Sequence, residues 1–228
     1  MKEEAEALKE IAKTTSKAID AAQTFGGFIS KYIGGPIDQG VGIFEDRLKY
    51  MRWERQIRLM ERAEQFLRSR GLQRPTRAVP MKIAVPIFHL GSLEDDDILQ
   101  DIWAKLLVNA ADGSFGKDIR RSYVAIIENI TSFEAVILER IYSISDDVAS
   151  DGGLYTAFLP DKITTIQPGS ENDQQPNEDV KLALSNLIRL GCITPASSIS
   201  GEQLLYRVYQ TSFGKAFVEA CTLREVIK

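Results

Sequence analysis

The chain has 228 residues, of which 44% are hydrophobic and 26% charged, and its formal net charge is −4. This composition is ordinary for a soluble globular protein, and the length allows one large domain or two small ones. A negative net charge argues against a protein that coats nucleic acid, because phosphate-binding domains usually carry an excess of cations. The two cysteines, Cys192 and Cys221, cannot form a four-ligand zinc site or a disulfide framework, which favours a reducing compartment.

The expected location is the cytoplasm. The N-terminal residues MKEEAEALKE are charged and lack the apolar core of a signal peptide. No run of about 18 apolar residues occurs, so a standard membrane span is not expected. Peripheral contact with the inner face of the cell membrane remains an alternative for the N-terminal helices described next.

Two long amphipathic helices are predicted in the N-terminal part, over residues 5–33 and about 43–70. In the first, apolar and small residues recur at spacings of three and four and include Gly26, Ile29 and Ile33. Gly34, Gly35 and Pro36 should end it, since glycine frees the backbone and proline removes a hydrogen-bond donor.

The glycine-rich segment between these helices, FGGFISKYIGGPIDQGVGIF, is a candidate interaction element. Small residues recur every seven to eight positions, and they permit close helix packing or entry into a membrane. A helical hairpin corner or a subunit interface explains the same pattern. The candidate residues are Gly26, Gly27, Gly34 and Gly35.

Residues 45–77 form the most basic part of the chain, with ten Arg and Lys against five Asp and Glu. Arg55, Arg58 and Arg62 are predicted to share one helix face, and three interpretations are open. The face binds an anionic partner such as lipid headgroups, RNA or an acidic protein. Alternatively, it is solvated and supported by pairs four residues apart, or it docks on an acidic part of the same chain.

The middle of the chain is predicted to be helical after one extended stretch. The prolines and β-branched residues of PMKIAVPI, residues 80–87, favour an extended conformation. Ser92 and Asp95 resemble a capping box that opens a strongly amphipathic helix through Trp103. A further helix is expected over roughly 116–130.

The last third predicts a winged-helix-like module. A capping box at Thr131 and Glu134 starts a helix to about residue 144, and a helix follows at about 179–190. Strands are expected near residues 192–194 and 204–209, and a final helix is capped by Thr211 or Ser212. The segment 152–166 has a mixed pattern that allows a short strand or a short helix, and 167–178 is expected to be a polar loop. The fold class is therefore mainly α, with domains expected over 1–78, 79–130 and 131–228.

No constellation for catalysis, cofactor binding or metal binding is found, so a non-enzymatic protein is expected. The single histidine, His89, has no triad or metal-ligand spacing around it, and phosphate-cradling and nucleophile-elbow motifs are absent from the sequence. The acidic run from Glu94 to Asp97, with Asp101, suits a helix start better than a divalent cation.

A winged helix also suggests a DNA- or RNA-binding regulator, which is the alternative function. The helix that would enter the groove offers only Lys181 and Arg189 as cations, alongside Glu178 and Asp179. Phosphate contacts need more cations than this, so a protein-interaction module is favoured and nucleic acid is not expected as a partner.

The order of these segments resembles the Abi-alpha family of bacterial proteins. The likeness covers most of the chain and is most specific in VP followed by LEDDDILQDIWAKLLVNA, with TSFEAVILERI and TSFGKAFVEAC nearer the C-terminus. The resemblance implies a role in abortive infection, a defence against phage, and it brings no catalytic residue with it. Function is then expected to proceed through oligomerisation, binding of a protein partner or membrane association.

Overall fold

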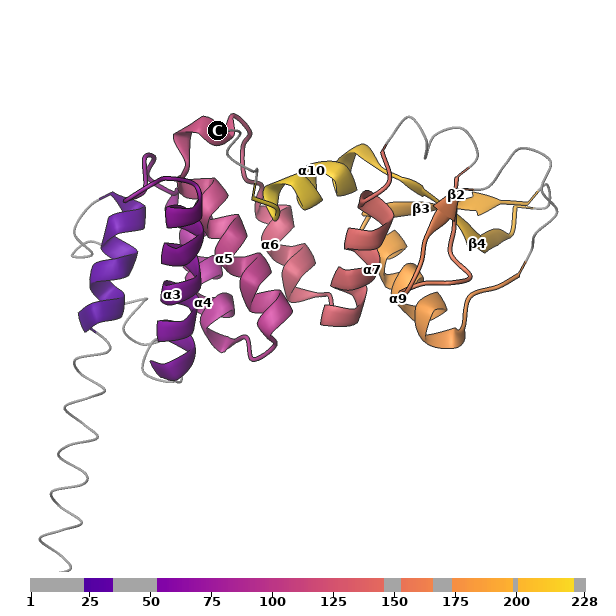
Figure 1. Ribbon diagram of the computed structural model, residues 1–228, viewed down its shortest axis with the longest axis horizontal. Coiled ribbons are helices and arrows are strands. Elements are labelled where there is room, and N and C mark those ends of the chain that lie inside the picture. The colour runs from indigo at the N-terminus through magenta and orange to yellow at the C-terminus, as the bar shows by residue number, and fades with distance from the viewer. Residues whose placement is uncertain (1–22, 35–52, 146–152, 166–173, 199–200, 224–228) are drawn as a thin grey trace, which may run out of the picture. The chain divides into compact units, whose positions relative to one another are not determined.

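The computed structural model describes residues 23–34, 53–145, 153–165, 174–198 and 201–223. It confirms a mainly helical fold with a small antiparallel sheet of four strands (Figure 1). The described residues form two compact units, one up to Val124 together with Leu223 and one over Ala125–Thr222. Residues of the expected segments 1–78 and 79–130 thus belong largely to one unit, and the second unit begins a few residues before the expected position 131.

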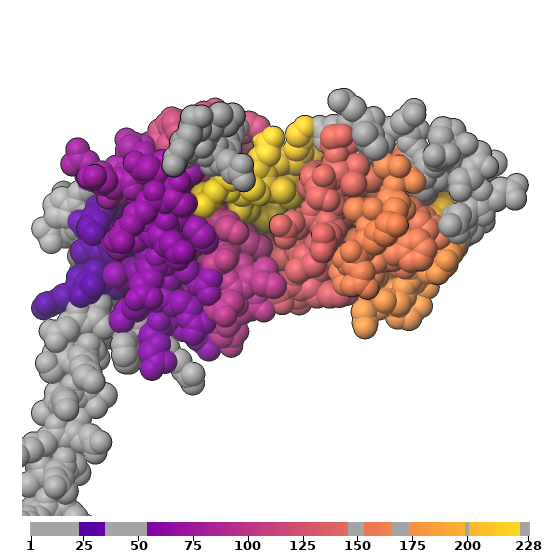
Figure 2. Space-filling view, viewed as in Figure 1, coloured from indigo at the N-terminus to yellow at the C-terminus, as the bar shows by residue number. Residues whose placement is uncertain are grey.

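The N-terminal unit is helical. It contains a helical segment over residues 23–33, α3 (Trp53–Ser69), α4 (Met81–Leu93), α5 (Asp97–Ala111), the short 3-10 helix η2 (Gly113–Phe115) and the start of α6 (Arg121–Glu128). Helices α3, α4 and α5 pack on one another around a core that includes Leu59, Ile87, Trp103 and Leu107. In the space-filling view α3 forms much of the face of this unit that is turned toward the viewer (Figure 2).

Trp103 is the largest buried side chain of this core, and a glycine makes room for it. A Cβ atom added to Gly91 of α4 would lie 3.2 Å from the Trp103 Cβ and 3.3 Å from the Leu59 Cδ2. Because these distances are tighter than ordinary van der Waals contact, the absence of a side chain at Gly91 lets α4 approach its two neighbours closely.

An aromatic cluster fixes the helical segment 23–33 to α4. The rings of Phe25, Phe28 and Tyr32 each lie about 6 Å from Phe88, measured between centroids. The Tyr32 carbonyl also accepts a hydrogen bond of 2.8 Å from the Val79 N–H. Of the predicted stripe, Ile29 is buried, whereas Gly26 and Ile33 are half-buried, so the buried stripe runs mainly through the aromatic residues.

The expected extended stretch at residues 80–87 is wrong, because these residues form the first half of α4. Pro80 precedes the first turn as the N-cap residue, where its missing N–H costs nothing, and Pro86 lies inside the helix. An interior proline costs about 3 kcal/mol. Burial of Ile83, Ile87 and Phe88, worth about 1.5–3 kcal/mol for each side chain, offsets that cost.

The expected capping box at Ser92 and Asp95 is also wrong. Ser92 belongs to the last turn of α4, where its hydroxyl donates to the Phe88 carbonyl at 2.5 Å. The N-cap of α5 is Asp96, whose carboxylate accepts from the backbone N–H groups of Ile98 and Leu99 at 2.9 and 3.1 Å. A run of acidic residues offers several N-cap candidates, and the C-terminus of α4 determines which one is used.

The helix expected over 116–130 is shorter than predicted. Gly116 follows η2 in the left-handed conformation with a φ of 70°, and α6 begins only at Arg121 and ends at Glu128. The left-handed residue turns the chain before the helix can start.

The C-terminal unit combines helices with the sheet. Its elements are α7 (Ser132–Tyr142), β1 (Leu154–Tyr155), β2 (Thr164–Thr165), α9 (Glu178–Arg189), β3 (Ile193–Ser197), β4 (Gln203–Gln210) and α10 (Ser212–Ala220). The strand order is β2-β1-β4-β3, so β3 lies at one edge. The pairing of β3 with β4 is irregular between Pro195 and Ala196.

The predicted helix starts in this unit are confirmed. The Thr131 hydroxyl and the Glu134 carboxylate form a complete capping box at α7, and Thr211 caps α10. Glu134 is buried, and its second oxygen accepts a 2.7 Å hydrogen bond from the Asn186 amide of α9. One carboxylate thereby starts α7 and connects it to α9.

A compact polar junction holds the start of α10. The Tyr142 hydroxyl donates to the Cys192 carbonyl at 2.6 Å and accepts from the Thr211 N–H at 3.0 Å. The Thr211 hydroxyl accepts from the Gly214 N–H at 2.9 Å. A Cβ atom at Gly214 would overlap both the Cys192 carbonyl oxygen and the Tyr142 hydroxyl, so glycine is required there by close packing.

Candidate interaction surface

The three predicted arginines of α3 form ion pairs with the acidic start of α5. An Arg58 Nη1 donates to the Asp97 Oδ1 at 2.9 Å, and an Arg62 Nη2 donates to the same oxygen at 2.8 Å. The Arg62 Nη1 also pairs with Asp101. We call this set, Arg55, Arg58 and Arg62 with Asp95, Asp97 and Asp101, the arginine–aspartate layer.

Arg55 extends the layer to the end of α4. Its guanidinium donates to the Leu93 carbonyl at 2.6 Å and to the Asp95 carboxylate at 3.2 Å. The buried amide of Gln100 donates to the Arg55 carbonyl at 3.3 Å. Arg55 thus neutralises part of the negative end of the α4 dipole, as a cation at a helix C-terminus does.

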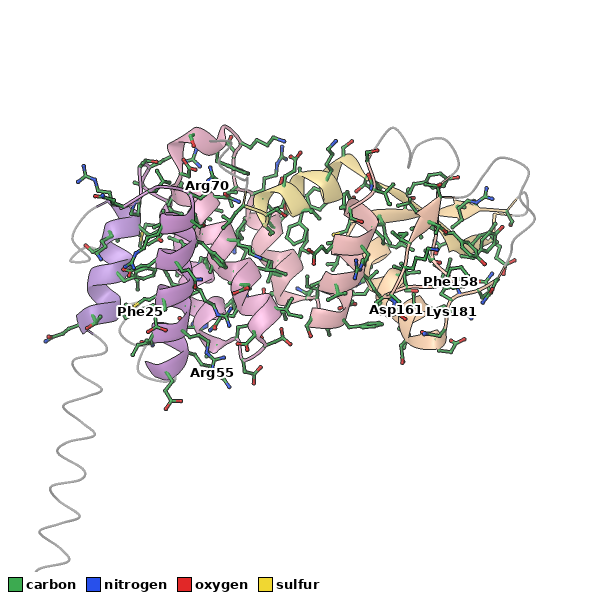
Figure 3. All side chains as sticks on the ribbon, viewed as in Figure 1. Phe25, Arg55, Arg70, Phe158, Asp161 and Lys181 are labelled. Atoms are coloured by element: carbon green, nitrogen blue, oxygen red, sulfur yellow. The ribbon has the colours of Figure 1, made fainter. Side chains whose placement is uncertain are left out.

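A further ion pair lies beyond the C-terminal end of α3, and sequence reasoning missed it. The Arg70 Nη2 donates to the Asp112 Oδ2 at 2.7 Å, and the two side chains are only 10% and 1% exposed. The other Asp112 oxygen accepts from the Ser114 N–H at 2.8 Å. Arg55 and Arg70 lie near opposite ends of α3, so α3 is attached to the α5 region at both ends (Figure 3).

The geometry of the arginine–aspartate layer is that of docking on an acidic part of the same chain, one of the three interpretations left open by the sequence. The guanidinium groups point toward α5 and have carboxylate partners within the chain. An anionic partner would have to compete with those carboxylates. A pair four residues apart, Arg68 with Glu64 at 3.5 Å, is also present.

The arginine–aspartate layer explains why acidic residues cluster between Glu94 and Asp101. In the described part of the chain, no three His, Cys, Asp or Glu side chains gather in a way that could hold a metal ion. Asp96 caps α5, while Asp95, Asp97 and Asp101 are ion-paired with arginines. These carboxylates therefore stabilise the packing of α3 on α5.

The predicted glycines lie apart from this layer. Gly26 and Gly27 belong to the helical segment 23–33, and no atom lies within 4 Å of a Cβ placed on Gly27. Gly34 ends the segment with a φ of 76°, and its N–H donates to the Ser30 carbonyl at 3.2 Å. The predicted stop at Gly34 is confirmed, whereas Gly35 lies outside the described residues.

The C-terminal unit exposes apolar side chains on its surface. Leu182 on α9 is 70% exposed, and Phe158 between β1 and β2 is 47% exposed. The cations of α9 have partners on their own helix, since Lys181 pairs with Glu178 at 2.8 Å and Arg189 donates to the Asn186 side chain at 2.6 Å. The exposed face of α9 is thus mixed rather than basic.

The side chains whose pKa values are clearly shifted, Cys192 and Tyr32, are both buried. Burial raises the pKa of the Cys192 thiol from its ordinary value of 9.0 to about 12, so the thiol is protonated and a poor nucleophile at neutral pH. Burial, with a smaller contribution from Glu64, raises the pKa of the Tyr32 hydroxyl above its ordinary range. His89 lies half-buried in α4.

No helix within the described residues is long and apolar enough to cross a membrane. This finding covers only the helical segment 23–33 of the first predicted helix and the part of the second from Trp53 onward.

Comparison with known proteins identifies a family. The family model described as abortive infection alpha matches residues 54–221, a range that contains the arginine–aspartate layer and nearly all of the C-terminal unit. No curated protein and no solved structure matches the chain. Since the match covers well over half of the sequence, the chain belongs to the abortive infection alpha family.

Proposed function

We propose that this protein acts in abortive infection without catalysing a reaction, and that α9 of the C-terminal unit contacts a protein partner or a second copy of the chain. Membership of the family supports an abortive-infection-related role in general. The contact through α9 is the part that the proposal adds.

The observation that carries the proposal is the exposed face of α9. Leu182 is the most exposed large apolar side chain in the described part of the chain, and it stands on a regular twelve-residue helix. Covering such a side chain with another protein removes apolar surface from water, which favours association. The order α7, α9, the β3–β4 hairpin and α10 is compatible with the winged-helix-like module expected from the sequence, in which the helix before the hairpin would be the recognition element.

The charge of α9 favours a protein over DNA or RNA. Its first turn carries Glu178 and Asp179, and its two cations, Lys181 and Arg189, already interact with side chains of the same helix. Binding to a phosphate backbone requires several available cations, because counterion release supplies most of the affinity.

Two substitutions of one residue distinguish these partners. Leu182→Glu and Leu182→Lys both remove the apolar side chain, but they change the local charge in opposite directions. An apolar protein contact is weakened by both, whereas binding to nucleic acid is weakened by the glutamate and kept or strengthened by the lysine. The residue is exposed, so both variants should melt within a few degrees of the wild type.

The assay is phage plaque formation on cells that express each variant. We expect the wild-type chain to reduce plaque counts and both Leu182 variants to lose this protection. Protection by Leu182→Lys with loss in Leu182→Glu would favour the nucleic-acid alternative. Undiminished protection by both variants would show that α9 is not the contact.

The membrane contact predicted for the N-terminal helices is tested separately. Flotation with liposomes of anionic phospholipid compares the full chain with a chain that lacks residues 1–43. Flotation of the full chain alone would place the contact in that segment, and equal behaviour of the two would refute it.

A further inference from the structure

We infer that a surface cavity of the N-terminal unit, of about 650 Å³, is a binding site for a phosphorylated small molecule. Among the residues that the structure describes, its lining includes four cationic side chains, Arg77, Lys82, Arg120 and Arg121, and one acidic side chain, Asp118. These described lining residues carry a net charge of +3, in a chain whose net charge is −4. The inference does not depend on the proposed function of α9.

Within the part of the chain that the structure describes, three cations of this cavity lack the carboxylate partners that four arginines near α3 have. Arg55, Arg58, Arg62 and Arg70 each pair with an aspartate. In contrast, no ion pair to Lys82, Arg120 or Arg121 is formed by any residue that the structure describes. Positive charge is therefore left without a counter-charge in this cavity and is available to an anion.

The fourth cation, Arg77, is held in place by uncharged groups. Its Nε donates to the Ala110 carbonyl at 3.1 Å, and its Nη2 lies 3.4 Å from the Asn109 carbonyl. Both carbonyls belong to the last turn of α5. These contacts fix the guanidinium without neutralising its charge, and they leave donor groups for an anion.

The backbone around the cavity also favours an anion. Lys82 is in the first turn of α4, and Arg121 and Ser122 are in the first turn of α6. Neither first turn contains an acidic residue, and no side chain caps the start of α4. A cation at a helix N-terminus is repelled by the helix dipole, so these positions are unfavourable until an anion binds between them.

The rest of the lining and the size of the cavity suggest more than a bare inorganic ion. Ala78, Pro80, Ile83, Ala110 and Ile119 supply apolar surface beside the charges. Ligand sites of about 300–1,000 Å³ usually combine apolar walls with a few polar groups that fix orientation. A ligand with two phosphate groups and a less polar part, such as a nucleoside diphosphate, matches both the charge and the lining.

The test is calorimetric titration of the full chain with pyrophosphate, ADP and adenosine. We expect ADP and pyrophosphate to bind and adenosine to bind far more weakly, because the cations recognise the phosphate groups. Adenosine that binds as tightly as ADP would overturn the inference, and so would a protein that binds ADP but does not bind pyrophosphate. So would the absence of any binding by both ADP and pyrophosphate.

Matched variants locate the site. The double substitution Arg120→Ala with Arg121→Ala should weaken binding of pyrophosphate by about tenfold or more, since two charge-assisted hydrogen bonds are lost. The control, Arg140→Ala with Lys162→Ala, removes two exposed positive charges from the C-terminal unit and should change binding less than twofold. Equal weakening in both double variants would show that only net charge matters, and it would refute the site.

Discussion

The two kinds of ion pair that attach α3 to the α5 region should differ strongly in their effect on stability. Arg70 and Asp112 are 10% and 1% exposed, whereas Arg58 and Asp97 are 45% and 71% exposed. Asp112→Asn leaves the buried Arg70 guanidinium without a counter-charge. Removal of one partner from a buried pair costs about 3–5 kcal/mol, and the lower end applies because the asparagine oxygen still accepts a hydrogen bond. Asp97→Asn should cost less than about 1 kcal/mol.

Urea denaturation followed by tryptophan fluorescence measures both values. The two tryptophans, Trp53 and Trp103, belong to the N-terminal unit, so the fluorescence change reports the unfolding of that unit. Addition of Arg70→Gln to Asp112→Asn should recover part of the lost stability, because the uncompensated charge is then removed as well. A cost for Asp112→Asn below about 1 kcal/mol, or an equal cost for Asp97→Asn, would refute this reasoning.

Further substitutions test the packing of both units. Gly214→Ala should destabilise the C-terminal unit by about 1–3 kcal/mol or more, because its Cβ overlaps the Tyr142 hydroxyl, and thermal melting by circular dichroism would detect this. Gly27→Ala should instead stabilise the chain by about 0.5–1 kcal/mol in the same assay, since the site is open and helical. Trp103→Ala should cost about 3–5 kcal/mol in urea denaturation. The Cys192 thiol, with its pKa raised to about 12, should resist alkylation in the native protein. Because the folded protein favours the protonated thiol, this group should add to the free energy of unfolding below pH 9, and the contribution should be lost between about pH 9 and 12. Urea titrations at several pH values would show this loss.

Elements with strong local signals were predictable from the sequence. The capping box of Thr131 and Glu134 and the cap at Thr211 place helix starts correctly, because each depends on side chains within three residues of the helix start. The stop at Gly34 follows from the same kind of local rule. These features need no knowledge of what packs against the helix.

Elements decided by tertiary packing were not predictable in the same way. The prolines of residues 80–87 disfavour a helix locally, yet burial of Ile83 and Ile87 outweighs that preference in α4. Segment 23–33 carries two overlapping apolar stripes that share Ile29, and the packing on α4 buries the aromatic one. The aromatic residues Phe25, Phe28 and Tyr32 were the available signal for it.

The candidate surface shows the same division. Helical spacing correctly places Arg55, Arg58 and Arg62 on one side of α3. The sequence could not choose their partner, because the aspartates are 35 to 40 residues away in the chain. The cavity was harder to predict, because the sequence shows only that residues near 120 are basic. That these residues form a cavity depends on the start of α4, which also lines it.

The edge strand β3 limits how copies of this protein can associate. Pro195 has no N–H, and the pairing irregularity beside it disturbs the strand at the same point. An incoming strand would therefore meet an incomplete row of donors on β3, which disfavours continuous sheets between molecules. Association through the β3 edge is thus disfavoured, and contacts made there by side chains can give an assembly of defined size instead of a growing fibre.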